Sequence, residues 1–279
     1  MNIELLCKED LIMRIYAISQ QGWHKSVKHT VNMRNDGAVG NTLESLLGIT
    51  ENNLPIPNAQ EWEIKAQRKD STSLVTLKHV EPSPRACKVV TNILLPLHGW
   101  RHQLAGKKYP QDEMSFRQTI RASQFTDRGF TILVDREAKK LRLVFDHTRV
   151  KSDVPEIAGW LEEVKQRTGF APLNPEPFWA FDDLEPLIAQ KLRNCFYVIA
   201  DSKIENEHEW FRFEELYLLS DFRFDAFLQA IETGDVLVDF DARTRHNHGT
   251  KFRLRKGAWP SLYANVQRIF APDQPLQLP

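Results

Sequence analysis

The segment 57–65, Pro-Asn-Ala-Gln-Glu-Trp-Glu-Ile-Lys, holds the residues with the clearest chemical potential. Its alternation after a proline-rich turn predicts a strand over 62–66. Side chains two residues apart share one face of a strand, so Glu61, Glu63 and Lys65 should project together while the intervening residues face the core. Carboxylates bind Mg²⁺, and a neighbouring lysine can orient or deprotonate an attacking water. The pattern predicts a hydrolytic metal site, and the alternative is an exposed Glu–Lys pair.

A second polar segment, 243–255, is strongly basic. Its cationic and imidazole side chains are Arg243, Arg245, His246, His248, Lys251, Arg253 and Arg255. The two histidines would point the same way from a strand, but no cysteine or third histidine lies close enough in sequence to complete a zinc site. Arginine is the commonest partner of guanine, and an aspartate such as Asp239 can accept a hydrogen bond from cytosine. The segment therefore favours contact with DNA, with a solvated basic hairpin as the alternative.

The net charge of the chain is zero, but the charge is unevenly distributed. The sequence has 37 Lys and Arg against 37 Asp and Glu. Residues 1–150 have six more basic than acidic side chains, residues 243–279 also have six more, and residues 151–242 have twelve more acidic ones. Binding to duplex DNA depends on neutralising phosphates, so two basic ends that converge in space would suit it. The alternative is an ordinary solvated surface.

Composition restricts the class of protein. The chain has 279 residues, of which 42% are hydrophobic and 27% charged, which predicts one large domain or two small ones with a real core. A disordered chain and a membrane protein are excluded. Residues 1–20 lack the pattern of a signal peptide, so a cytoplasmic protein is expected. Cys7, Cys87 and Cys195 fit neither a disulfide framework nor a zinc spacing.

Periodicity predicts the elements that must position these residues. Helices are expected over 3–20, 42–47, 184–192 and 222–233, and strands over 62–66, 74–77, 130–134, 141–145, 196–200, 210–219, 236–240 and 251–254. This mixture indicates an α/β or α+β fold with a mixed sheet. The proline-rich stretch 149–178 is the best candidate for an insertion or a connection between lobes.

Two blocks of motifs resemble a known family. They comprise Gly40-Asn41-Thr42-Leu43-Glu44-Ser45-Leu46-Leu47, the Pro57-Asn58 and Glu63-Ile64-Lys65 motif, Ser73-Leu74-Val75-Thr76-Leu77, Pro82-x-Pro84-Arg85, Ser202-Lys203-Ile204-Glu205-Asn206-Glu207, Gly234-Asp235-x-x-Val238-Asp239 and His246-Asn247-His248-Gly249-Thr250-x-Phe252-Arg253. In this order they resemble the MvaI/BcnI restriction endonucleases, relatives of the mismatch-repair nicking enzyme MutH in the PD-(D/E)xK nuclease superfamily. The resemblance covers 22–93 and 195–255, whereas 94–194 align loosely.

The resemblance implies a restriction-endonuclease-like fold, a mixed sheet flanked by helices, with two lobes that form a DNA clamp. It places a catalytic lobe core in 1–93, a connecting and insertion region that is partly catalytic lobe in 94–194, and a DNA recognition lobe in 195–279. The implied activity is sequence-specific, Mg²⁺-dependent hydrolysis of double-stranded DNA by a monomer that cuts one strand at a time. No membrane and no obligate protein partner are expected, and a cognate DNA methyltransferase should belong to the same system.

Residue by residue, the resemblance implies that Glu63 binds the metal, Lys65 activates or orients water, and Glu44 adds a carboxylate from the preceding helix. Asn58 stands where the family usually has aspartate, so it keeps an oxygen ligand but loses a charge. Glu61 is a possible substitute. Three interpretations remain open: an active enzyme that uses Asn58, an active enzyme that recruits Glu61 or Glu44, and a catalytically weakened protein that binds or nicks DNA.

The recognition residues follow in the same way. Asp239 and Arg253 match positions that read bases in the major groove, and His246 and His248 match positions that reach DNA. Arg243 and Asp241 are further candidates beside a loop that is shorter here than in the family. The loop over 100–110 is assigned to contact with phosphates because of its charge. A scaffold without a nucleic-acid role is the remaining alternative, and it predicts no salt-dependent binding to duplex DNA.

Overall fold

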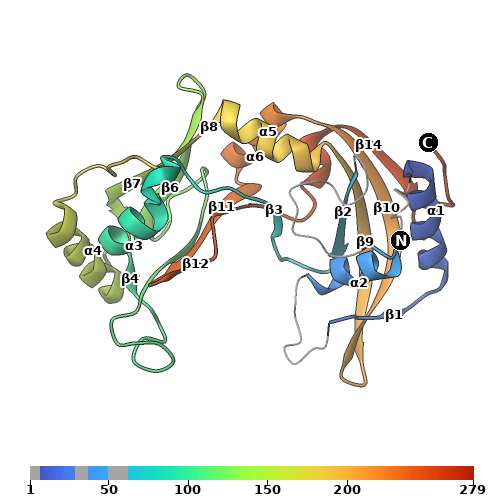
Figure 1. Ribbon diagram of the computed structural model, residues 1–279, viewed down its shortest axis with the longest axis horizontal. Coiled ribbons are helices and arrows are strands. Elements are labelled where there is room, and N and C mark those ends of the chain that lie inside the picture. The colour runs from blue at the N-terminus through green and yellow to red at the C-terminus, as the bar shows by residue number, and fades with distance from the viewer. Residues whose placement is uncertain (1–6, 29–36, 50–61) are drawn as a thin grey trace. The chain divides into compact units, whose positions relative to one another are not determined.

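The computed structural model describes residues 7–28, 37–49 and 62–279 of the chain (Figure 1). The chain divides into two units, each made of segments that are distant in sequence. Unit 1 comprises Met1–Ser73, Ala189–Arg223 and Trp259–Pro279, and unit 2 comprises Leu74–Ile188 and Phe224–Ala258. The boundaries expected near residues 93 and 194 therefore do not coincide with the observed ones.

Unit 1 is built on a mixed sheet. Its strands are β1 (His24–Lys25), β2 (Trp62–Arg68), β9 (Asn194–Glu205), β10 (His208–Phe222) and β14 (Tyr263–Phe270). The strand order is β1-β10-β9-β2, and β14 also pairs with β10. The β2–β9 pair is parallel and the others are antiparallel, which confirms the mixed sheet expected from the sequence. This parallel pairing is the reason why residues near 195 belong to the same unit as Glu63 and not to a separate C-terminal lobe.

Two helices cover one face of this sheet. Helix α1 (Lys8–Gln20) confirms the expected N-terminal helix within the described residues, and α2 (Ala38–Leu46) begins four residues earlier than expected. Glu9 and Asp10 in the first turn of α1 favour its start, because acidic groups interact well with the positive end of a helix. Apolar side chains of both helices pack with Ile64 of β2 in one buried cluster. One face of β2 therefore packs in the hydrophobic core.

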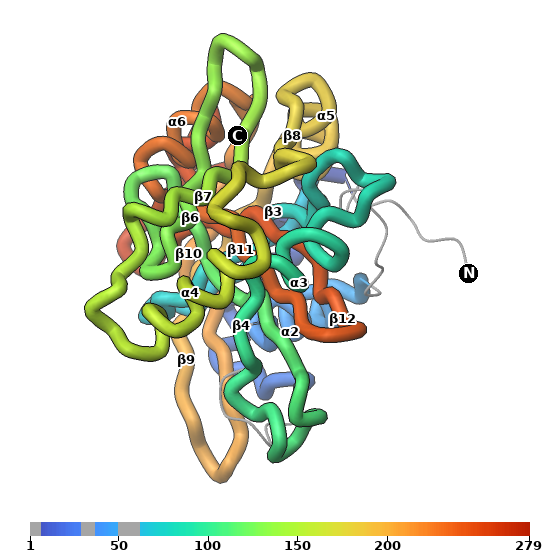
Figure 2. Tube along the Cα trace, turned by 90° about the vertical axis from the view of Figure 1, so that its left-hand side faces the viewer, coloured from blue at the N-terminus to red at the C-terminus, as the bar shows by residue number. Residues whose placement is uncertain are grey.

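Unit 2 contains two antiparallel sheets. The larger has the order β3-β13-β11-β5-β4, with β12 paired to β11, and the smaller has the order β6-β7-β8. The strands are β3 (Val75–His79), β4 (Trp100–Arg101), β5 (Met114–Ile120), β6 (Arg128–Asp135), β7 (Lys140–Val150), β8 (Phe178–Ala180), β11 (Val236–Arg243), β12 (His246–Asn247) and β13 (Lys251–Leu254). The pairing of β6 with β7 confirms the expected hairpin. Figure 2 shows the long β6–β7 and β9–β10 hairpins in a second view.

Short helices complete unit 2. They are η1 (Arg85–Cys87), η2 (Val90–Leu94), α3 (Leu95–His98), α4 (Pro155–Thr168), α5 (Phe181–Leu192) and α6 (Phe224–Thr233), and the last turn of α5 lies in unit 1. The region 94–194, expected to be a connection, supplies much of the core of unit 2 instead. Its strands bury Phe116 and Phe130, whose rings meet edge to face. Buried aromatic faces of this kind build a core of their own and not a linker.

Buried His98 makes the fold sensitive to acid. Its ring is 2% exposed and packs between Phe130 and Phe145, and burial, aided by the charge of Arg167, lowers its pKa from 6.5 to about 4. The unfolded chain therefore takes up this proton first, so stability should fall as pH drops from about 6.5 to about 4. When the pH is lowered from 7 to 5, the free energy of unfolding of the wild type should fall by about 2 kcal/mol more than that of His98→Gln. Urea unfolding curves at the two pH values measure this difference. Equal losses would contradict this assignment.

No helix in the described part of the chain is both long and apolar enough to span a membrane. Cys7, Cys87 and Cys195 are free thiols.

Candidate functional site

Glu63 and Lys65 form an ion pair on β2, in which Glu63 is buried and Lys65 is partly exposed. Glu63 is 1% exposed, and its Oε1 lies 2.5 Å from Lys65 Nζ. Its Oε2 is also buried and has no hydrogen-bond partner among the described residues. A buried carboxylate is unfavourable unless it is paired, and an unpaired oxygen increases that cost. The alternative of an ordinary exposed Glu–Lys pair is therefore wrong.

The alternation of β2 places this pair on the face away from α1. Ile64 packs in the apolar cluster with α1 and α2, and Trp62 and Ala66 contact that cluster, as predicted. Gln67 lies on the same side of the strand as Glu63 and accepts a hydrogen bond from the Tyr197 hydroxyl at 2.8 Å. One face of β2 thus contributes to the core, and the other carries Glu63, Lys65 and Gln67, of which Glu63 and Gln67 are buried.

Lys191 is a third member of this group that sequence reasoning missed. It lies in the last turn of α5, its side chain is 27% exposed, and its Nζ is 3.4 Å from Glu63 Oε1. The sequence showed 184–192 as a helix, but no local pattern connects Lys191 with a strand far away in the chain. Two ammonium groups therefore meet one carboxylate oxygen, and the other oxygen remains available for a ligand.

The neighbouring Cys195 thiol and Tyr263 hydroxyl are neutral. Cys195 lies opposite Glu63 in the β2–β9 register, and burial raises the pKa of its thiol. Burial likewise raises the pKa of the Tyr263 hydroxyl well above its usual value. Neither group therefore carries a charge at neutral pH.

The Mg²⁺ expected from the sequence needs oxygen ligands around Glu63. Within the described residues, no group of three His, Cys, Asp or Glu side chains is placed to hold a metal ion. Asn58 and Glu61 lie outside the described residues. The buried, unpaired Oε2 of Glu63 fits a hard cation, because such ions bind carboxylate oxygens. Glu63 is therefore compatible with the expected role, and the other ligands remain predictions.

Glu44 has a different set of neighbours. It lies on α2 and lines a pocket of about 250 Å³ together with Lys28 and Asn41. Neither Glu63 nor Lys65 is among the residues that line this pocket. The structure thus brings Glu63 and Lys65 together, and a catalytic role for Glu44 stays a prediction.

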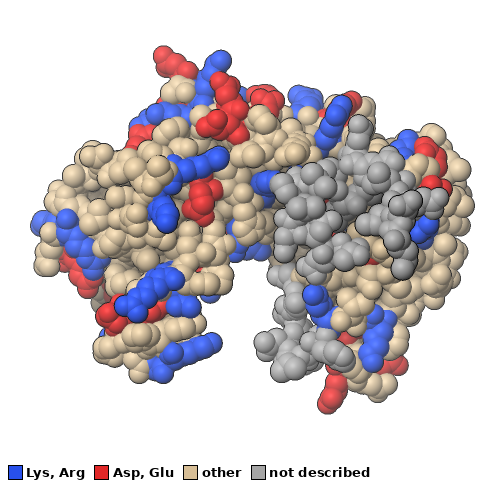
Figure 3. Space-filling view, in the orientation of Figure 1, with Lys and Arg blue, Asp and Glu red and all other residues tan. Residues whose placement is uncertain are grey.

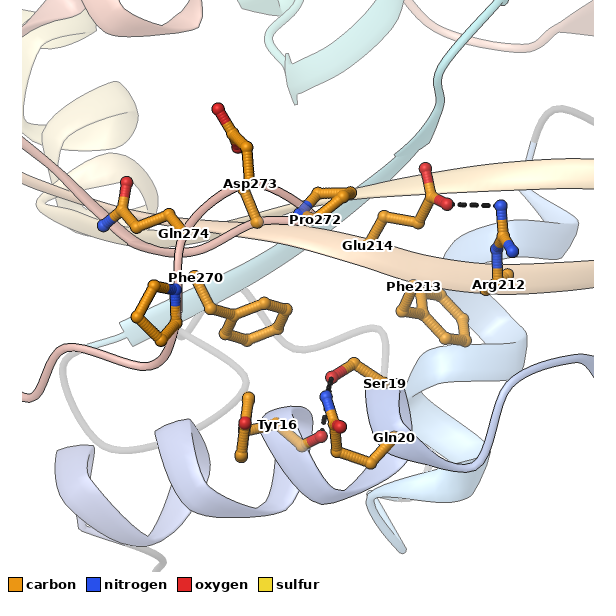
Figure 4. A pocket seen from close by; sticks show the side chains of 12 residues that line it. Tyr16, Ser19, Gln20, Arg212, Phe213, Glu214, Phe270, Pro272, Asp273 and Gln274 are labelled. Atoms are coloured by element: carbon orange, nitrogen blue, oxygen red, sulfur yellow. Dashed lines mark hydrogen bonds and ion pairs between the residues drawn. The ribbon is translucent and has the colours of Figure 1, made fainter.

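A larger pocket in unit 1, of about 490 Å³, lies on the face of the sheet opposite to Glu63 (Figure 4). Tyr16 and Ser19 of α1 line it, as does Phe213, which belongs to the same core cluster as Ile64. Arg212 and Glu214 at its edge form an ion pair of 2.5 Å. The pocket is therefore separate from Glu63 and is not part of the candidate site.

In unit 2, the structure brings Asp239 and Arg253 together on adjacent strands. Arg253 Nη1 lies 3.3 Å from Asp239 Oδ2, and its Nη2 donates to the carbonyl of Leu74 at 2.8 Å. Thr119 donates to Asp239 Oδ1 at 2.9 Å. The Nε of Arg253 is buried without a partner among the described residues. These groups form an ordered set of donors and acceptors on one face of the sheet.

The same face continues toward the end of β11. Asp241 lies between two cations, with Arg117 Nε at 3.5 Å and Lys251 Nζ at 3.6 Å. Sequence reasoning missed Arg117 and Thr119 of β5, although the alternation of polar residues in that segment was the available signal. Alternating donors and acceptors across three strands suit the edges of base pairs in a major groove.

Arg243 and the two histidines lie at the β11–β12 hairpin. Arg243 pairs with His246 in the strand register, donates to Glu113 Oε1 at 2.8 Å, and stacks over the ring of Tyr109. The ring centroids of His246 and His248 lie 4.1 Å apart, and both side chains are exposed. Tyr109 belongs to the charged loop expected to contact phosphates, and Lys and Arg side chains are prominent at this end of unit 2 (Figure 3). The hairpin and the loop therefore meet where Arg243 lies over Tyr109.

Comparisons with known proteins support a family assignment. The profile described as the MvaI/BcnI restriction endonuclease family matches residues 12–263. Among solved structures, the chain is similar to "Restriction endonuclease MvaI-cognate DNA substrate complex", with 24% identity, a TM-score of 0.71, and coverage of 96% of this chain and 99% of that chain. It is also similar to "Restriction endonuclease MvaI in the absence of DNA", with 25% identity, a TM-score of 0.52, and coverage of 93% and 96%. A search of curated proteins found no match.

The profile match extends over most of the chain and includes both the β2 site and the β11–β13 surface. The structural similarity supports the same fold over nearly the full length. The chain therefore belongs to the MvaI/BcnI restriction endonuclease family and is a site-specific deoxyribonuclease.

Proposed function

We propose that this protein is a Mg²⁺-dependent type II restriction endonuclease that acts as a monomer and cuts double-stranded DNA one strand at a time. The observation that carries the proposal is the buried Glu63 carboxylate, with one oxygen on Lys65 and the other without a partner among the described residues. This arrangement leaves a ligand position beside a group that can act on water.

In the proposed mechanism, Glu63 Oε2 would hold Mg²⁺ together with Asn58 or a substitute carboxylate from Glu61 or Glu44. The ion would act as a Lewis acid on the oxygens of the scissile phosphate. Lys65 orients a water for in-line attack on phosphorus and balances negative charge as it accumulates on the phosphate. The new bond joins the water oxygen to phosphorus as the water gives up a proton to solvent, and the bond from phosphorus to the 3′ oxygen breaks. The products are a 5′-phosphate and a 3′-hydroxyl, which takes its proton from solvent.

Lys191 acts as a positioning residue for Glu63 in this proposal. Because it holds Oε1 together with Lys65, it directs Oε2 toward the ligand position. We expect Lys191→Met to impair cleavage in one of two ways. Either the cleavage rate falls by roughly 10- to 100-fold, or the Mg²⁺ concentration needed for the half-maximal rate rises by roughly the same factor. Lys191→Arg should recover part of the loss because it keeps the charge.

The matched control is Gln190→Met, an exposed neighbour on the same helix, which should behave as the wild type. The test compares rates across a Mg²⁺ titration, together with affinity for DNA without metal, which should change little. Two results together would contradict the positioning role. The cleavage rate of Lys191→Met would stay low at every Mg²⁺ concentration, and Lys191→Arg would cleave as slowly as Lys191→Met.

Asn58 distinguishes the active enzyme from the catalytically weakened alternative. We propose that the present set of groups is already active, because Glu63, Lys65 and two further carboxylates accompany Asn58 in the sequence. Asn58→Asp should then give no gain or a loss in cleavage with Mg²⁺. A large gain would favour the weakened, DNA-binding or nicking protein instead.

Recognition is assigned to the polar face of unit 2. We propose that Asp239 and Arg253 read bases, that Arg243, His246 and His248 contact DNA at the hairpin, and that unit 1 carries out catalysis. The clamp around the duplex is part of the same proposal. A cognate DNA methyltransferase should protect the host, and its gene beside this one would be the simplest supporting observation.

The direct test uses supercoiled plasmid with one target site. With Mg²⁺, the nicked circle should build up before the linear form, at a rate proportional to protein concentration, and EDTA should stop the reaction. Sedimentation of the free protein should give the mass of one chain. Linear product without a nicked intermediate, or a rate that rises with the square of protein concentration, would argue against a monomer with a single site.

A further inference from the structure

A pocket of about 410 Å³ lies in unit 2. Two distant segments form it: 81–91, which runs from the end of β3 through η1 into η2, and the tip of the β11–β12 hairpin. Buried Val89 and Val90 contribute an apolar wall. The exposed part of the lining is basic and includes Arg85, Lys88 and Arg245.

The cations of this pocket are unpaired within the described residues. Arg85, Lys88 and Arg245 form no ion pair with the described residues, whereas Arg68, Arg136, Arg142 and Arg243 each do. The acidic residue of the lining, Glu81, accepts hydrogen bonds at its Oε1 from neutral groups: the Thr250 backbone N–H at 2.8 Å and Asn247 at 3.3 Å. Because three basic side chains face this one carboxylate, the lining carries net positive charge.

Two of these cations occupy an unfavourable backbone conformation. Lys88 has φ of 46° and Arg245 has φ of 61°, in the left-handed region where glycine is tolerated best. Lys88 follows η1, and Arg245 lies in the connection between β11 and β12, so two unrelated turns place a basic residue at a position that glycine would occupy with less strain. Strain of this kind persists where another requirement outweighs it, and it occurs often at binding sites.

We infer that this pocket binds backbone phosphates of the DNA duplex beside the bases that the β11–β12 hairpin reads. The inference rests on the proposed function, because His246 of that hairpin also lines the pocket. Phosphate contacts of this type carry no sequence information, but they fix the position and register of a reading element in its groove. Three unpaired cations around one pocket offer the donors and the charge that such a contact needs.

The test uses glycine substitutions, which remove charge and strain together. Lys88→Gly and Arg245→Gly should each keep or raise the melting temperature, because glycine adopts these φ values readily. Each should nevertheless weaken DNA binding roughly tenfold at 0.1 M salt and reduce the slope of log affinity against log salt concentration by about 1. The loss should be equal for target and unrelated duplexes.

Lys139→Gly is the matched control. Lys139 is exposed, has φ of 50° and lies in the β6–β7 turn of the same unit. Figures 1 and 2 place this turn on the side of unit 2 away from β12. Its glycine variant should also keep or raise the melting temperature but leave the affinity and the salt slope unchanged.

Binding is measured with Ca²⁺ in place of Mg²⁺, over a range of salt concentrations. If the wild type cleaves DNA with Mg²⁺ but the salt slopes of Lys88→Gly and Arg245→Gly are unchanged, the pocket does not bind phosphates. The proposed function would then remain intact. A loss confined to the target sequence would also overturn it, because it would indicate base reading. A wild type that neither binds nor cleaves DNA would overturn the proposed function and this inference together.

Discussion

Lys65→Ala should reduce the rate of DNA cleavage by about 10³-fold or more while binding to the target persists. The reason is the position of Lys65 Nζ, 2.5 Å from the buried Glu63 carboxylate, where it can act on the attacking water and on the developing phosphate charge. The measurement is a single-turnover plasmid assay with Mg²⁺, combined with a binding assay without metal. Cleavage at the wild-type rate would refute the proposed mechanism.

Two further variants separate chemistry from folding. Lys65→Ala leaves the Glu63 anion with Lys191 as its charged partner, so its melting temperature must be compared with that of the wild type. Glu63→Gln removes the anion itself and should also be inactive; because it takes the carboxylate away from Lys65 and Lys191, its melting temperature must be compared in the same way. Lys69→Ala is the matched control, because Lys69 follows the same strand but is half exposed and pairs with Glu214. Its cleavage rate should not change.

Arg253→Ala should lower the ratio of cleavage rates at target and single-base-altered sites by roughly 10- to 100-fold, since a good bidentate contact to a base contributes about 1–3 kcal/mol of discrimination. In the protein, Arg253 is held between Asp239 and the carbonyl of Leu74, so its guanidinium is already ordered on the strand. Arg253→Lys should not restore the ratio, because an ammonium group cannot reproduce the planar fork of arginine. The target is first determined by sequencing the ends of cleaved DNA.

Arg255→Ala is the control for this prediction. Arg255 is exposed and also donates to a backbone carbonyl, that of Gly234, but it lies beyond the end of β13. Its substitution should leave the ratio unchanged. If Arg253→Ala lowers the rates at all sites equally, Arg253 supports the fold of the sheet and does not read a base.

Much of the secondary structure could be predicted from local patterns. The alternation around Trp62 predicted β2, and the apolar runs near residues 196 and 236 predicted β9 and β11, all of which the structure contains. These predictions succeeded because the alternation of apolar and polar residues along a short segment indicates which side chains of a strand are buried. The start of α2 and the full length of β7 were missed, because tertiary packing extends elements beyond their local signals.

The division into units could not be predicted in the same way. The sequence suggested consecutive lobes, but β9 pairs in parallel with β2, and the segment between them builds most of unit 2. A parallel pair requires a crossover connection, and nothing in the local sequence states which strand a distant one will join. The role of 94–194 was misjudged for this reason.

The residue types and spacing of Glu63 and Lys65 in the sequence determined that they would share one face of a strand. The basic character of 243–255 and the order of the family motifs were equally evident there. Only the tertiary structure decided that Glu63 is buried, that Lys191 reaches the same carboxylate, and that Arg85 and Lys88 meet the tip of the hairpin. The physical reason is that burial and charge pairing depend on contacts between residues distant in the chain, whereas a strand's periodicity depends on its neighbours in sequence.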